Sequence, residues 1–337
     1  MPGDCSGHKR NNHTLRHTHY HCAQFTVMTF TQLEYIVALD AHRHFAEAAA
    51  QCFITQPTLS MQVQKLEEEL GVKIFDRSKQ PVLPTDPGVE IIEHAKKILA
   101  ERDALNEMIN AKKDLVKGEL KLGIIPTLAP YLLPLFIPSF TKKHEQIKLV
   151  INELTTSNII ANLRQGKIDA GILVTPLNEA GVKEDVLFYE EMLAYVSKNN
   201  AVYKKTYLLP KDIDPDKLLL LQEGHCFRSQ MVQLCELQKS KTHSHFEYEA
   251  GSFETLRRMV ELNDGITILP ELATLDMTAA QKNHLRYFKA PVPVREVSIV
   301  THRNYSKRRL IDELKKEILL AVPDKLKKNR KVMVVPV

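Results

Sequence analysis

The sequence predicts an all-α winged helix-turn-helix, then a long helix, then a larger α/β domain. Hydrophobic residues recur at helical spacing from Phe30 onward, and a heptad repeat of aliphatic residues follows residue 86. Short apolar runs then alternate with helix-length segments, which is typical of α/β domains. We expect a His- and Cys-rich head at 1–27, the winged helix-turn-helix at 28–85, the long helix at 86–117, the α/β domain at 118–325 and a tail at 326–337.

Three helices are expected between residues 30 and 70. The third opens near Thr55, and proline is tolerated in its first turn. Its inner face is apolar and its outer face polar: Leu59, Val63, Leu66 and Leu70 against Thr58, Ser60, Gln62 and Lys65. Gly71 ends this helix, and residues 72–75 and 81–83 are expected to form two short strands of a wing. In such a fold the polar-faced helix can lie in the major groove of DNA.

A long helix is expected from residue 86 to about residue 116. Ile91, Ile98 and Leu105 repeat every seven residues along it. A helix of that length spans ~45 Å, and pairing with a second copy would bury its apolar stripe. The alternative is a helix that packs within its own chain.

Composition narrows the function classes. No stretch approaches ~18 consecutive apolar residues, and the basic amino terminus lacks the apolar region of a secretory signal. We therefore expect a cytoplasmic protein that has no membrane partner. The five cysteines are too few and too unevenly placed for a disulfide framework, and a disulfide in a reducing compartment would be transient. The net charge of +5 indicates nucleic-acid binding only weakly.

Cys226 has two basic neighbours, His225 and Arg228. A positive neighbourhood lowers the pKa of a thiol, and the thiolate is the form that attacks peroxides. The sequence therefore predicts a reactive thiol at Cys226. The alternative is an inert buried cysteine, which fits Cys52 better.

Several motifs resemble LysR-type transcriptional regulators. The amino-terminal domain of that family is matched at residues 30–35, 46–49, 55–60, 65–67 and 70–77. The resemblance implies that the long helix makes the dimer. It also implies a two-lobed, periplasmic-binding-protein-like α/β effector domain at about 119–322, with crossovers near Glu190 and Val294 and a ligand cleft between the lobes. We expect these residues to contact DNA: Gln56, Pro57, Thr58, Ser60, Gln62, Lys65, Arg77 and Lys79.

Within that family the chain resembles the peroxide-sensing OxyR group. It shares a Gly-His-Cys-x-Arg motif at 224–228, a second cysteine nine positions after Cys226, and local matches at 125–127, 131–134 and 254–257. The resemblance implies that Cys226 is the peroxidatic thiol and Cys235 the resolving one. It also implies a peroxide pocket of Thr127, Thr156, His225, Arg228, His245 and Arg303.

The same resemblance implies an activator of oxidative-stress genes, not an enzyme. Its expected partners are a double-stranded DNA operator, further copies in a homodimer and homotetramer, RNA polymerase, and cellular thiol reductants. We expect no cofactor and no metal. Two alternatives remain: a LysR-type regulator that senses a small organic ligand in the cleft, and a thiol peroxidase that turns over with an electron donor.

The spacing of the two cysteines carries a structural prediction. Residues 228–237 are expected to be helical. Two cysteines nine residues apart in one helix are separated by ~13.5 Å along the axis and lie on opposite faces. A disulfide needs Cα atoms roughly 4.4–6.8 Å apart. Oxidation must therefore rearrange the segment from about residue 224 to 237.

The head has no counterpart in the family. It contains Cys5, Cys22, His8, His13, His17, His19 and His21. We expect Met28 to be the natural start, and the head to be disordered or not native. The alternative is zinc or copper binding by the Cys and His side chains.

Overall fold

The computed structural model describes residues 28–111, 117–235, 250–303, 305, 307–327 and 332–336. The amino-terminal part holds the three expected helices: α1 (Phe30–His42), α2 (Phe45–Gln51) and α3 (Gln56–Leu70). The wing strands β1 (Phe75–Asp76) and β2 (Leu83–Pro84) pair antiparallel and are shorter than the sequence suggested. The winged helix-turn-helix is therefore confirmed.

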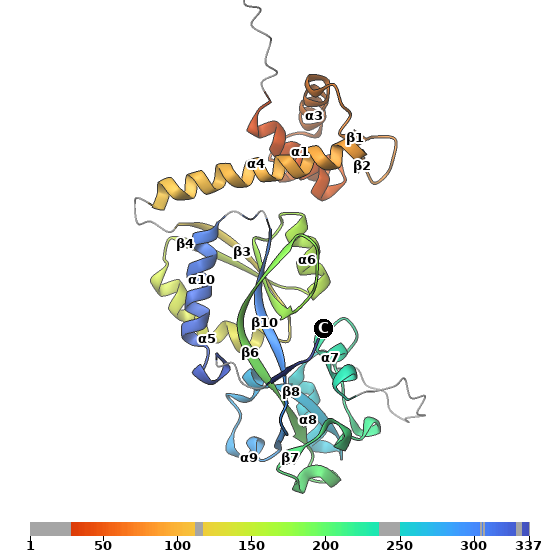
Figure 1. The fold of residues 1–337 in the computed structure, drawn as a ribbon, viewed down its shortest axis with the longest axis vertical. Coiled ribbons are helices and arrows are strands. Elements are labelled where there is room, and N and C mark those ends of the chain that lie inside the picture. The colour runs from red at the N-terminus through yellow and green to blue at the C-terminus, as the bar shows by residue number, and fades with distance from the viewer. Residues whose placement is uncertain are drawn as a thin grey trace, which may run out of the picture.

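The long helix α4 (Asp86–Ala111) packs on α1 and extends well past the three short helices (Figure 1). At 1.5 Å per residue its 26 residues span about 39 Å. The remainder of the expected helix, 112–116, lies outside the described residues.

The first lobe of the α/β domain is a sheet covered by helices (Figure 1). The strands β3 (Gly118–Ile124), β4 (Ile147–Glu153) and β5 (Ala170–Thr175) run parallel, and β10 (Val292–His302) pairs antiparallel with β5. The helices of this lobe are α5 (Ala129–Lys143), α6 (Thr156–Arg164) and α10 (Arg308–Ala321).

The strand β6 (Val182–Val196) extends into the second lobe, where its residues Met192–Val196 pair with the strands of that lobe. The other strands of the second lobe are β7 (Tyr207–Leu208), β8 (Ile266–Pro270), β9 (Leu285–Phe288) and β11 (Val332–Val334). Its helices are α7 (Cys226–Leu234), α8 (Phe253–Leu262) and α9 (Ala279–Lys282). Short 3-10 helices lie at Ala201–Lys204, Pro210–Asp212, Pro215–Lys217, Glu271–Thr274 and Asp324–Leu326.

The two lobes are joined by β6 and β10, which pair antiparallel along most of their length. Arg295 lies opposite Glu190 in this pairing, so the crossovers fall where the sequence placed them. The apolar run at 218–221, which its composition predicts to be a strand, forms only isolated bridges. Leu218 pairs only with Ile266 and Leu221 only with Ala250, because this segment crosses between two neighbours instead of following either.

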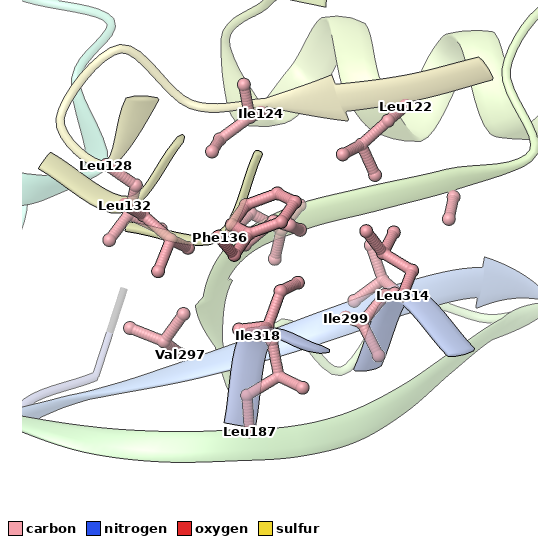
Figure 2. Close-up of a cluster of buried hydrophobic side chains, with 14 of the residues drawn as sticks. Leu122, Ile124, Leu128, Leu132, Phe136, Leu187, Val297, Ile299, Leu314 and Ile318 are labelled. Atoms are coloured by element: carbon pink, nitrogen blue, oxygen red, sulfur yellow. The ribbon is translucent and has the colours of Figure 1, made fainter. Parts of the chain in front are cut away.

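Each part has its own apolar core. In the first lobe, side chains from β3, α5, β6, β10 and α10 meet between the sheet and its helices, and Figure 2 shows Phe136, Ile299 and Ile318 at the centre. Separate buried clusters fill the second lobe and the winged helix-turn-helix. Two lobes with separate cores can move relative to each other at low cost in packing.

None of the helices in the described ranges is both long enough and apolar enough to cross a membrane.

Candidate functional site

Cys226 lines a cleft between α6 of the first lobe and the start of α7 in the second. The cleft measures about 470 Å³. It brings together three of the predicted site residues, Thr156, His225 and Cys226. The other lining residues are Ser157, Ile160, Ala161, Arg164, Leu177, Glu179, Gly224 and Ser229.

Two glycines help to place the walls of this cleft. A Cβ at Gly171 in β5 would lie 2.4 Å from the side chain of Ile159, so glycine lets α6 pack closely on the sheet. Gly224 has a φ of +92°, a conformation that L side chains rarely adopt. This turn allows α7 to begin at Cys226, where the positive end of the helix dipole favours a thiolate.

Opposing effects act on the pKa of the Cys226 thiol. Burial raises the pKa of the thiol, and this effect dominates. The Arg295 guanidinium, the Thr156 hydroxyl and the backbone N–H of Phe227 each lower that pKa. The buried Thr156 Oγ1 has no conventional hydrogen-bond partner among the described residues. A polar group beside the thiol is therefore available to a small ligand.

Arg295 is the cation that most lowers the pKa of the Cys226 thiol, although it comes from β10 far along the chain. It is completely buried, and its Nε donates to Glu190 Oε2 at 2.7 Å. Its Nη1 and Nη2 donate to the Oγ1 and backbone oxygen of Thr127, both at 3.2 Å. The guanidinium also lies 5.4 Å from the ring centre of Phe227 in α7. Arg295 thus links Thr127 of the first lobe to Phe227 in the first turn of α7.

The Glu190–Arg295 pair was not predicted from the sequence, where Glu190 and Val294 were identified only as crossover positions. The sequence did contain a signal for this pair: an acid, Glu190, stands at one predicted crossover, and a base, Arg295, stands beside the other. Opposite charges buried in neighbouring strands are expected to pair, because an unpaired buried charge is costly.

The sequence pointed to His225 and Arg228 as the groups that lower the pKa of the Cys226 thiol, whereas the largest lowering contribution comes from Arg295. Burial lowers the pKa of His225, so the imidazole is neutral near pH 7. Arg228 turns back and donates from Nη1 to the Leu221 carbonyl at 2.8 Å. The groups that act on the Cys226 thiol come from Arg295, Thr156 and the start of α7 instead.

Cys235 lies at the opposite end of α7, as its C-cap. Cys226 packs against the core of the first lobe and Cys235 against the core of the second. Burial raises the pKa of Cys235 to about 11. Both thiols are free. The helix expected at 228–237 is observed at 226–234, and it separates the two cysteines by ~13.5 Å.

The other predicted pocket residues are dispersed. Thr127 is buried and bonded to Arg295, so it does not line the cleft. Arg303 is exposed at the end of β10 and lines a different cleft, next to His302 and Lys96, so it is separate from the Cys226 pocket. His245 lies outside the described residues.

The outer face of α3 carries the predicted DNA contacts. Leu59, Val63 and Leu66 are fully buried, which fixes the orientation of the helix. On the other side Gln56, Pro57 and Lys65 are exposed and Thr58, Ser60 and Gln62 are half-buried, while Arg77 and Lys79 are exposed in the wing.

Glu67 attaches the wing to α3. Its buried carboxylate accepts the backbone N–H groups of Ile74 and Phe75 at 2.9 and 3.1 Å. It also pairs with Lys73 at 3.3 Å and with Arg77 at 3.5 Å. The sequence marked Glu67 only as part of a motif, since a buried acid in a polar helix has no distinct local signature.

The helix α4 leaves apolar side chains exposed in the single chain. Ile98, Leu105 and Ile109 are 40%, 53% and 51% exposed. This stripe is suited to pairing with a second copy.

Within the described ranges, no group of three or more His, Cys, Asp or Glu side chains is arranged to hold a metal ion.

Comparison with known proteins now identifies both parts of the chain. Residues 30–89 match the bacterial regulatory helix-turn-helix protein model of the lysR family, and residues 113–319 match the LysR substrate binding domain. The chain belongs to the LysR family. It is a DNA-binding transcriptional regulator of that family and belongs to its OxyR group.

Named relatives of this LysR-family chain include the hydrogen peroxide-inducible genes activator of Dickeya chrysanthemi, which is 38% identical over 246 residues, 73% of this chain and 80% of the relative. The DNA-binding transcriptional dual regulator OxyR of Escherichia coli K12 has the same identity and coverage. A full-length OxyR variant from Pseudomonas aeruginosa has a TM-score of 0.69 and 37% identity, and the match covers 88% of this chain and 99% of that one. A peroxide-bound OxyR mutant from Corynebacterium glutamicum has a TM-score of 0.55 and 26% identity, with coverage of 87% and 94%.

Proposed function

We propose that this chain senses hydrogen peroxide through Cys226 and controls oxidative-stress genes by forming a reversible Cys226–Cys235 disulfide. One observation carries the proposal: both thiols belong to α7, and only Cys226 lies in the interlobe cleft beside a buried arginine. The names of the relatives, hydrogen peroxide-inducible genes activators, support the choice of peroxide as the signal.

In the first step the Cys226 thiolate attacks one oxygen of hydrogen peroxide. The S–O bond forms, the O–O bond breaks, and the second oxygen leaves as hydroxide, which takes a proton to become water. Neutral His225 lines the cleft and can accept the thiol proton and return it to the leaving oxygen. The Thr156 hydroxyl beside the thiol can orient the peroxide, while Thr127 acts indirectly by holding Arg295.

In the second step the Cys235 sulfur attacks the sulfenic sulfur of Cys226. The S–S bond forms and the sulfenic oxygen leaves as water, so that two thiols and one peroxide give one disulfide and two waters. The helical separation forbids this bond until residues 224–237 rearrange. Unwinding also removes Cys235 from the apolar core that raises its pKa, which makes the thiolate easier to form.

The DNA end of the molecule responds to this rearrangement through the dimer. We propose a homodimer joined by α4 that pairs into a homotetramer and presents α3 of each copy to a double-stranded operator. RNA polymerase is the downstream partner, and cellular thiol reductants reset the disulfide by thiol exchange. Because one chain then reports one oxidation event, sensing is stoichiometric and needs no catalytic turnover.

The test is intact-protein mass spectrometry before and after dilute peroxide, followed by peptide mapping of the thiols. The expected product links Cys226 to Cys235, and a Cys52→Ser protein should give the same linkage as a matched control. A response of reporter output to a small organic metabolite, with the thiols unchanged by peroxide, would instead support the ligand-sensing alternative.

A further inference from the structure

The carboxy-terminal strand β11 returns to the redox helix. It pairs in parallel with β10, at Val292–Val294, directly before Arg295. Beyond the strand, the Val335 N–H donates to the Val294 carbonyl at 2.9 Å, and the Val335 side chain is only 3% exposed, within the core of the second lobe. Figure 1 shows this end of the chain beside α7. A terminal segment held in this way is an integral part of the lobe.

The same segment bonds to the middle of α7. Gln230 lies between the two cysteines and is completely buried. Its Nε2 donates to the Val335 carbonyl at 2.6 Å. The segment Met333–Pro336 also lines a groove of about 660 Å³ together with Gln233, Leu234 and Cys235. The tail therefore bonds to the centre of α7 and shares a groove with Cys235 at its end.

The Gln230–Val335 bond and the groove beside Cys235 belong to the helical form of α7. The inference rests on the proposed function, in which residues 224–237 rearrange before the disulfide can form. Rearrangement moves Gln230 away from Val335 and takes Cys235 out of the groove. An interaction present in the reduced form and lost in the oxidised form shifts the equilibrium toward the reduced form.

We propose that the tail segment Val332–Pro336 is a strap that stabilises reduced α7 and thereby sets how readily the disulfide forms. The strap raises the reduction potential of the Cys226–Cys235 pair, because a dithiol stabilised relative to its disulfide has a higher reduction potential. Loss of the strap must lower that potential and favour the disulfide. It must also speed the attack of Cys235 on the Cys226 sulfenic acid, because the strap opposes unwinding.

Two variants of the full chain test the strap. Gln230→Leu removes the side-chain donor at similar volume, and a chain that ends at Lys331 removes the strap itself. Gln222→Leu is the matched control, since its side chain is exposed and precedes the segment that rearranges. Each protein is equilibrated with reduced and oxidised dithiothreitol. In this exchange two electrons pass from the two dithiothreitol thiols, which close to a cyclic disulfide, to the protein disulfide, which opens to two thiols.

We expect both strap variants to favour the disulfide by about tenfold, which corresponds to a potential lower by about 30 mV for a two-electron couple. The control should match the parent. An unchanged or higher potential in both variants overturns the strap, even while peroxide still links Cys226 to Cys235. Absence of that linkage in the parent overturns the proposed function instead.

Thermal unfolding of each redox form separates a strap from a general packing role. The strap predicts a lower midpoint for the reduced Gln230→Leu protein and an unchanged midpoint for the oxidised one. Equal losses in both forms would show that Gln230 only supports the lobe, and would overturn the proposal.

Discussion

The helices α3 and α7 carry the proposed DNA contacts and the proposed redox thiols, yet they are held in different ways. The recognition helix α3 has 15 residues, ends at Gly71 in the left-handed conformation, and makes its core contacts within one small domain. The redox helix α7 has only 9 residues, and neither helix has a side-chain hydrogen bond at its N-cap. One end packs against the first lobe, the other against the second, and its centre bonds to the tail.

This difference matches the two tasks. Helices shorter than ~12 residues are marginal on their own, so α7 depends on contacts that other elements supply. Those contacts come from two lobes and from the strap, and the loss of any one of them can allow α7 to unwind. Reading DNA requires one conformation, and the fully buried inner face of α3 favours one, whereas a switch requires two conformations of similar free energy.

The largest expected effect comes from removing the attacking thiol. Cys226→Ser should abolish the peroxide response, because Cys235, the other thiol of the proposed pair, is buried with a pKa raised to about 11. Cys235→Ser should still form a sulfenic acid at Cys226 but give no disulfide. A peroxide-dependent reporter and thiol mapping measure both outcomes. Full activation by the Cys226→Ser protein would return the small-ligand alternative to first place.

The second effect concerns the cation beside that thiol. Arg295→Met should destabilise the fold by about 3–5 kcal/mol, because it leaves Glu190 buried without its partner. The double variant Arg295→Met/Glu190→Leu removes both charges and should recover much of this stability. In that double variant the pKa of Cys226 should rise, since Arg295 lowers it.

The pH dependence of peroxide reactivity measures this rise in the pKa of the thiol. The thiolate fraction increases with pH, so the rate profile of the double variant should move to higher pH. A pKa higher by about one would slow the reaction about tenfold at neutral pH. Chemical unfolding reports the stability separately. A rate profile identical to that of the parent would show that Arg295 acts only as a structural link between the lobes.

These two sites also show what the sequence could predict. The periodicity of Leu59, Val63 and Leu66 predicted α3, because a helix that packs within one small domain depends on local spacing. The positions of Cys226 and Cys235 in the chain were enough to predict that they lie too far apart to bond. The contribution of Arg295 was not predicted, because His225 and Arg228 are neighbours of Cys226 in sequence while Arg295 reaches the thiol through the pairing of β6 and β10. The strap was not predicted for the same reason.

A third, smaller effect tests whether α3 reads DNA as part of a pair. Leu105 is 53% exposed on α4 in the single chain. If a second copy covers it, Leu105→Glu should weaken the dimer by at least the ~1.5–3 kcal/mol that burial of a leucine contributes. Sedimentation at several protein concentrations gives the dissociation constant. Glu101→Gln, an exposed change on the same helix, is the control, and equal dimer affinity in both variants would place Leu105 outside the interface.

The smallest expected effects are on DNA binding, where contacts to bases can be distinguished from contacts to phosphates. Gln56 is exposed at the first residue of α3, whereas Lys79 is exposed in the wing beside Asp76. Gln56→Ala should relax preference at particular base pairs by about 1–3 kcal/mol, because an amide can bond to base edges. Lys79→Ala should weaken binding to all sequences alike and reduce the slope of affinity against salt by about one ion, because phosphates carry no sequence information. Operator binding at several salt concentrations distinguishes the two.

Since α3 packs within a domain that contains neither redox cysteine, the loss in Gln56→Ala should be equal in the reduced and oxidised protein. A loss that appears in only one redox state would show that α3 itself changes, and would remove the distinction between a fixed reader and a mobile switch.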